Sequence, residues 1–174
     1  ENILIDLKKK VDEYQNEHPY HFITFFEYMT MAAFIWFDKL NLDYIILEVG
    51  MGGLYDATNL IETSFGAITS IALEHTSYLG DTIEKIAFQK AGIIKQNQTM
   101  VIGFMDYNAK NVIRSQCELK NAKYIDVFEG QNYKNMKEIP DYFLYNWKEI
   151  DFSKRNLKGA YQKSNCRVAT ALAF

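Results

Sequence analysis

An apolar run that leads directly into three closely spaced glycines constrains the fold of this chain most. Residues 44–47 read Tyr-Ile-Ile-Leu, Glu48 follows them, and Gly50, Gly52 and Gly53 come next. An apolar run without alternation is typical of a strand buried on both faces, as in a parallel sheet. Glycines allow a tight turn and a close approach of the backbone to a ligand. Because ligands of open parallel sheets bind at the carboxyl ends of the strands, we expect Glu48 to meet a metal or a phosphate.

A second apolar run ends in the same way. It covers residues 66–73 and is followed directly by Glu74, His75 and Thr76. An isolated glutamate at a strand end is more often only solvated, but two neighbouring strands that both end in possible metal ligands favour a site. We therefore expect the side chains of Glu48 and His75 to point into one cleft at the same edge of the sheet.

The rest of the chain alternates helical and strand patterns, which predicts an α/β fold with a doubly wound, mostly parallel sheet. Helices are expected at residues 5–16, 24–37, 83–91, 108–119 and 160–173. Strands are expected at residues 99–104 and 123–128, with a short antiparallel pair formed by 142–147 and 152–157. Capping boxes are predicted at Thr24 with Glu27 and at Asp81 with Glu84, and Gly92 is expected to end a helix.

Composition restricts the classes of function. A net charge of −3 over 174 residues gives no electrostatic argument for nucleic acid or an anionic membrane surface. The apolar runs are too short and too often broken by charge to span a bilayer. Cys117 and Cys166 have no metal or redox spacing and suit a reducing compartment. We expect a cytoplasmic monomer.

Four motifs then resemble those of folylpolyglutamate synthases. Residues 48–59 read E-V-G-M-G-G-L-Y-D-A-T-N and resemble the family signature E-V-G-x-G-G-R-x-D-A-T-N. Residues 71–95 resemble the second signature, and residues 24–27 and 159–165 match two shorter ones, all in the family's order. The chain is therefore similar to folylpolyglutamate and dihydrofolate synthases, which are Mur-type ligases.

The resemblance implies an ATP-dependent ligase that uses Mg²⁺. Such enzymes phosphorylate a carboxylate of a folate, and the amino group of L-glutamate then attacks the acyl phosphate. By position, Glu48 and His75 correspond to the magnesium ligands, and Lys90 corresponds to a carbamylated lysine. The alternative for Lys90, which lies on the apolar stripe of its helix, is an ammonium group that reaches solvent while the stem packs.

The resemblance also implies substrate-binding residues. Asp56, with Thr58 and Asn59 in the same loop, corresponds to the pterin side, and Asn165 corresponds to the adenine-side asparagine. Phe26 corresponds to an aromatic residue that borders the pterin, although its helical position is equally typical of a core residue.

Three departures from the family pattern matter. The sequence contains no G-x-x-x-x-G-K-[ST], so the phosphate cradle is absent from these residues. We therefore expect residues 1–174 to be a partial central ATP-binding domain, inactive alone, without its N-terminal P-loop segment and a C-terminal domain. Leu54 stands where the family usually has Arg, and Glu74 replaces the usual Asp.

Two other hypotheses remain open. One is a different Mur-type amide ligase, which the D-A-T-N loop disfavours because cell-wall ligases lack it. The other is a non-catalytic α/β binding or scaffold fragment that retains old motifs. A phosphate-binding loop upstream in the coding sequence, with a second α/β domain downstream, would favour the enzyme.

Overall fold

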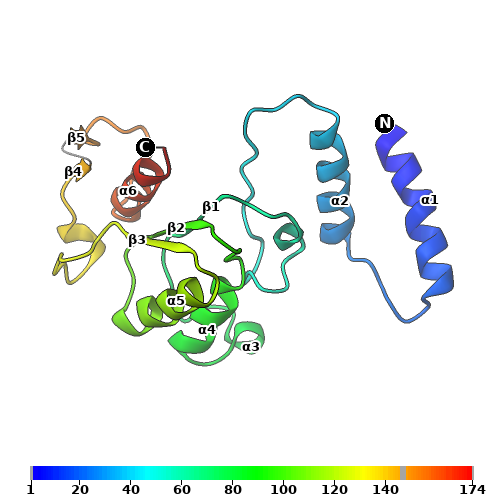
Figure 1. Cartoon of the computed structure of the whole chain (residues 1–174), viewed down its shortest axis with the longest axis horizontal. Coiled ribbons are helices and arrows are strands. Elements are labelled where there is room, and N and C mark those ends of the chain that lie inside the picture. The colour runs from blue at the N-terminus through cyan, green and yellow to red at the C-terminus, as the bar shows by residue number, and fades with distance from the viewer. Residues whose placement is uncertain (1, 146–147, 174) are drawn as a thin grey trace. The chain divides into compact units, whose positions relative to one another are not determined.

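The computed structural model describes residues 2–145 and 148–173 and divides them into two compact units. The N-terminal unit comprises the residues up to Met51 together with Asp56–Leu60. The sheet unit comprises Gly52–Tyr55 and the chain from Ile61 onward. Figure 1 labels the elements of both units. Among the described residues, the helices are all too short or too polar to cross a membrane.

Two helices form the N-terminal unit. Helix α1 spans Asn2–Glu17 and helix α2 spans Phe25–Asp38, and they pack together through Leu7, Val11 and Ala32. The predicted capping box at the start of α2 is confirmed. The Glu27 N–H donates to the Thr24 hydroxyl at 3.2 Å, and the Thr24 N–H donates to the Glu27 carboxylate at 2.7 Å. A short 3-10 helix, η1 (Ala57–Leu60), completes the unit.

The strand predicted at residues 44–47 is wrong. These residues adopt neither helix nor strand, and Tyr44 and Ile46 are 89% and 95% exposed. A strand forms only where a neighbouring strand satisfies its backbone N–H and C=O groups. None of the strands in the described part of the chain pairs with this run. Glu48 therefore follows an irregular segment and does not end a strand.

Three parallel strands form the main sheet in the order β1-β2-β3 (Figure 1). They are β1 (Phe65–Ile68), β2 (Thr99–Ile102) and β3 (Lys123–Asp126), with Ile68, Ile102 and Asp126 in register at their carboxyl ends. The predicted strands at 66–73, 99–104 and 123–128 are present, but each is shorter than expected. Strand β1 in particular ends well before His75, so the prediction that His75 directly follows a strand is wrong.

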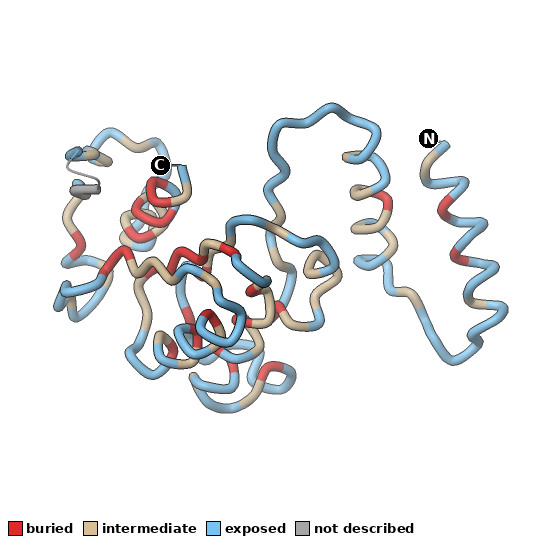
Figure 2. The backbone as a smooth tube through the Cα atoms, viewed as in Figure 1, coloured by how far each residue is buried: buried red, intermediate tan, exposed pale blue. Residues whose placement is uncertain are grey.

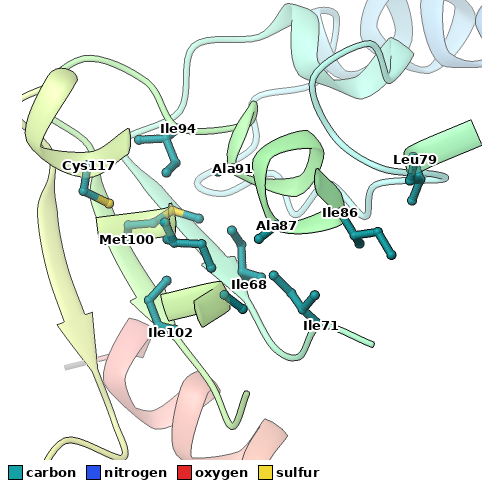
Figure 3. Packing of buried hydrophobic residues seen from close by; sticks show 12 residues of the cluster. Ile68, Ile71, Leu79, Ile86, Ala87, Ala91, Ile94, Met100, Ile102 and Cys117 are labelled. Atoms are coloured by element: carbon teal, nitrogen blue, oxygen red, sulfur yellow. The ribbon is translucent and has the colours of Figure 1, made fainter. Parts of the chain in front are cut away.

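Helices cover both faces of this sheet, which confirms the doubly wound α/β class. Helices α3 (Thr76–Leu79), α4 (Ile83–Ala91) and α5 (Tyr107–Leu119) belong to one side, and α6 (Tyr161–Ala173) belongs to the other. Side chains alternate along β2, so Met100 and Ile102 pack with α4 and α5, whereas Val101 packs with α6. Figure 3 shows the first of these clusters, and Figure 2 shows that the buried positions follow β2 and its helices.

The start of α4 differs from the prediction in one detail. Thr82 is the N-cap and accepts from the Lys85 N–H at 3.2 Å, so the capping box expected at Asp81 with Glu84 is wrong. Asp81 instead forms an exposed ion pair with Lys85 at 2.8 Å. Either residue could cap on sequence grounds, since both accept hydrogen bonds. The helix ends at Gly92 as expected.

A hairpin precedes the last helix. Strands β4 (Tyr142–Tyr145) and β5 (Lys148–Asp151) pair antiparallel, with Tyr142 opposite Asp151. An antiparallel pair was expected here, but the partner at residues 152–157 is wrong because the chain turns back earlier. Trp147, the end of the other predicted strand, lies outside the described residues. A short 3-10 helix, η2 (Met136–Glu138), lies between β3 and β4.

Candidate functional site

Asp56 organises the glycine-rich loop of the N-terminal unit. Its Oδ2 accepts from the N–H groups of Gly50 at 3.0 Å and Met51 at 2.9 Å. Its Oδ1 accepts from the Thr58 N–H at 3.0 Å and from the Thr58 hydroxyl at 2.6 Å. Burial alone would raise the pKa of Asp56, but these hydrogen bonds together outweigh burial and hold the pKa below its usual value. The carboxylate therefore fixes both sides of the loop while it stays ionised.

Phe26 lies against the same loop. A Cβ atom at Gly50 would come within 2.9 Å of Cζ of Phe26 and within 3.2 Å of Oδ2 of Asp56. A side chain at this position would therefore displace the aromatic ring or the carboxylate from its present place. Phe26 is 47% exposed, so it is not a core residue, and part of its ring is accessible beside the loop.

The other half of the glycine-rich segment packs on the end of α4 within the sheet unit. The Leu54 N–H donates to the Gln89 carbonyl at 2.8 Å. A Cβ at Gly53 would lie 2.9 Å from the carbonyl oxygens of Gln89 and Lys90, and a Cβ at Gly92 would lie 2.4 Å from Cα of Leu54. Gly53 in the loop and Gly92 at the end of α4 thus allow the backbones of these two segments to come into close contact. Leu54, which replaces the usual Arg, contributes to that contact.

His75 begins the short helix α3 in an unusual conformation. Its φ of 49° is left-handed, and its imidazole makes no capping hydrogen bond. The side chain is exposed. The preceding residue, Glu74, forms an ion pair with Lys90 of α4, with Nζ and Oε1 3.0 Å apart. The imidazole is therefore available to a ligand, whereas Lys90 already has a partner.

Asn165 lies on α6 at the far face of the sheet from α4. Its amide nitrogen donates to the Gln162 side chain at 3.2 Å. The neighbouring Ser164 is buried, and its hydroxyl accepts from the N–H of Phe104 at 3.2 Å. This bond fixes the first turn of α6 near the carboxyl end of β2, which is the ligand-binding edge of such sheets.

The donor set suits magnesium in part. Glu48 belongs to the N-terminal unit and His75 to the sheet unit, and both are exposed. Within the described residues, no three histidine, cysteine or acidic side chains gather into a metal site. Magnesium commonly takes only one or two protein ligands and completes its shell with water and phosphate oxygens. Taken singly, the Glu48 carboxylate is the type of ligand that such an ion prefers, and the His75 imidazole is a less common one.

The sequence alone did not predict that Asp56 accepts hydrogen bonds from its own loop or that Lys90 pairs with Glu74. The sequence did contain a signal for the Asp56 contacts, since an Asp two residues before a Thr in a glycine-rich segment is typical of an Asx turn. It contained none for the ion pair, because Glu74 and Lys90 meet only after the chain has folded.

A parallel sheet with helices on both faces defines an open α/β architecture, a class of protein whose ligands bind at the carboxyl ends of the strands. The model of the Mur ligase middle domain matches residues 9–173. The chain belongs to this family.

The similar relatives and solved structures are described as folylpolyglutamate synthases, several of them also as dihydrofolate synthases. The chain is 47% identical over 129 residues to the dihydrofolate synthase/folylpolyglutamate synthase of Haemophilus influenzae, covering 72% of this chain and 28% of that protein. It is 32% identical over 175 residues to the enzyme of the same description from Bacillus subtilis, covering 98% of this chain and 41% of that protein. The chain thus spans less than half the length of these relatives.

Two solved structures have the same fold. The apo form of L. casei FPGS matches with a TM-score of 0.84 and 26% identity, covering 99% of this chain and 43% of the other. A structure described as an FPGS-AMPPCP-folate complex matches with a TM-score of 0.80 and 27% identity, with the same coverage.

Proposed function

We propose that the whole protein containing this chain adds L-glutamate to a folate at the expense of ATP, as a folylpolyglutamate synthase that can also act as a dihydrofolate synthase. The observation that carries the proposal is a set of contacts within the N-terminal unit, where the Asp56 carboxylate accepts from the backbone of Gly50 and Met51 and Phe26 lies against Gly50. The fold shared with an FPGS complex that holds an ATP analogue and folate supports it. A cytoplasmic location and a monomeric state remain predictions.

The roles of this chain's residues follow from their chemistry. Glu48 and His75 are proposed to hold Mg²⁺, which would neutralise charge on the transferring phosphoryl group. Asp56 holds the glycine-rich loop in shape, with Thr58 and Asn59 beside it, and Phe26 offers a partly exposed ring against which a flat pterin can stack. Asn165 is proposed to face the adenine from α6.

Lys90 is proposed to carry a carbamate in the working enzyme. In this structure its Nζ pairs with Glu74, so the ion pair must open before a carbamate can form. We expect Lys90→Ala to lose activity in the full-length enzyme and to regain part of it with a short carboxylate such as acetate. Full activity of this variant without acetate would reject the carbamate.

The test of the function uses the full-length protein. Incorporation of labelled glutamate into dihydropteroate or a reduced folate is measured with and without ATP. We expect ATP-dependent incorporation that falls at least about 100-fold in Glu48→Ala and His75→Ala, since removal of a key charge-stabilising group in an active site has effects of this size. Glu17→Ala, an exposed charge in α1, is the control and should keep full activity. ATP-independent or absent incorporation by the unaltered protein would reject the proposal.

A further inference from the structure

Arg167 is a buried cation in the middle of helix α6. It is only 3% exposed, and within the described part of the chain no acidic side chain forms an ion pair with it. Its Nε is buried without a hydrogen-bond partner. A buried charge that has no counter-ion is costly. This cost indicates a contribution that an apolar side chain of similar length would not make.

The contacts of Arg167 are directional. Its guanidinium carbon lies 5.0, 5.7 and 4.9 Å from the ring centroids of Phe128, Tyr133 and Phe143. Its Nη2 donates to the Tyr142 carbonyl at 3.1 Å. Cation–π contacts and hydrogen bonds both weaken when the geometry changes. Arg167 therefore ties α6 to three separate points of the preceding chain, at the end of β3, in the following loop and in strand β4.

Lys163 makes similar contacts one turn earlier in α6. Its Nζ donates to the Ile139 carbonyl at 2.7 Å and lies 3.6 Å from the Asp141 carboxylate. Because Lys163 and Arg167 are four residues apart, they project from the same side of the helix. Strand β4 and the 3-10 helix η2 both contact α6 (Figure 1). Two cations on consecutive turns thus hold one side of α6 against this part of the chain.

Asn165 lies on the opposite side of α6. It is two residues from Lys163 and two from Arg167, which is a rotation of about 200° at 3.6 residues per turn. Its side chain is therefore turned away from both cations, and its amide donates to Gln162 in the same helix. Any rotation of α6 about its axis would redirect this amide.

We propose that Arg167 is a positioning residue, which sets the rotation of α6 about its axis and thereby the direction in which Asn165 faces the nucleotide. Apolar packing, such as that of Val168 in the same helix, tolerates small displacements. A guanidinium held between aromatic rings and a carbonyl does not, because its contacts depend on direction. The inference rests on the proposed function, since it depends on the adenine role of Asn165.

A double-mutant cycle in the full-length protein tests this role by steady-state kinetics. Arg167→Met keeps an unbranched apolar stem and removes the planar fork of donors. We expect it to raise KM for ATP about fivefold, as a small misplacement of a binding group would, and to change kcat and KM for the folate less than about twofold. In an Asn165→Ala background, Arg167→Met should have no further effect on KM for ATP, because the group that it positions is gone.

Thermal unfolding separates positioning from stability. Loss of the buried charge offsets the lost contacts, so Tm of Arg167→Met should stay within about 3 °C of the unaltered protein. Ile113→Val in the core of α5 is the control, which should lower Tm and leave KM for ATP unchanged. Arg167→Lys keeps the charge and should raise KM for ATP less than Arg167→Met does. It takes the place of Arg167→Met in the cycle if that variant does not fold.

The cycle distinguishes the possible failures. An unchanged KM for ATP in Arg167→Met, or the same increase in KM with and without the Asn165 side chain, would overturn the positioning role. An increase in KM that Ile113→Val reproduces would also overturn it, because the effect would then follow stability alone. An unchanged KM for ATP in Asn165→Ala would instead reject the proposed adenine role of Asn165, on which the inference depends.

Discussion

The carboxylate of Asp56 receives hydrogen bonds from both sides of the glycine-rich loop, from Gly50 and Met51 on one side and from Thr58 on the other. Both oxygens are used, so the loop has its shape before any ligand binds. Such preorganisation lowers the entropy that binding would otherwise lose. At the scale of single residues, Asp56 therefore acts first on its own loop and through the loop on a substrate.

We expect Asp56→Ala in the full-length protein to raise KM for the folate about tenfold, since a hydrogen bond to a charged group contributes about 1.5–3 kcal/mol. KM for ATP should change less than about twofold, because the loop belongs to the proposed pterin side. Steady-state kinetics with each substrate varied in turn would measure both. Thr58→Val, which removes only the hydroxyl donor, should have a smaller effect. Equal increases in both KM values would assign Asp56 a purely structural role.

Acid should loosen the same loop. The pKa of Asp56 is lower in the folded protein than its usual value, so ionised Asp56 contributes stability above the unfolded pKa of about 3.9. That contribution is lost as the pH falls through the lower folded pKa. The amide resonances of Gly50 and Met51 should therefore stay constant from pH 7 to about 4 and shift only below it. A shift centred near pH 6 would contradict this assignment.

At the scale of elements, α4 is the support for three different segments. Loop residues 52–54, the turn at His75 and helix α5 all pack on it. Helix α6 has a different kind of anchor. Its Arg167 is buried, lies over the rings of Phe128, Tyr133 and Phe143, and donates to the Tyr142 carbonyl at 3.1 Å. Aromatic faces attract a guanidinium and offset part of the cost of burying it.

Gly92→Ala should separate loop 52–54 from α4. The new Cβ would lie 2.4 Å from Cα of Leu54, and a backbone atom cannot move aside without displacing the loop. Overpacking of this kind costs about 1–3 kcal/mol. Hydrogen exchange of the Leu54 amide, which donates to Gln89, should accelerate at least about fivefold. Gln96→Ala at an exposed position nearby should have no effect, and an unaltered Leu54 amide in Gly92→Ala would contradict the prediction.

At the scale of the whole molecule, the sequence lacks the phosphate-binding motif G-x-x-x-x-G-K-[ST]. A nucleotide bound to residues 1–174 would have neither the cradle of backbone N–H groups nor the lysine for its β- and γ-phosphates. We expect these residues alone to show no measurable ATP turnover and, by calorimetry, at most weak ATP binding. A micromolar Kd for ATP would contradict this expectation and would require a phosphate site elsewhere in the chain.

The sequence by itself determined the class of fold, most of the longer elements and the family. Helices α1, α2, α4, α5 and α6 and the strands β1, β2 and β3 all lie within or close to their predicted ranges, because periodicity and capping are local properties. The four motifs were also enough to predict the Mur ligase family, which the match over residues 9–173 confirms.

The tertiary structure alone decided which apolar runs become strands and which side chains meet. Residues 44–47 have the composition of a strand but find no partner among the described strands, and ladder bonds depend on a neighbour that composition cannot reveal. The pairing of Glu74 with Lys90 and the left-handed backbone of His75 are likewise set by segments far apart in sequence. Long-range contacts decided these features because they depend on the position of α4, which no local pattern specifies.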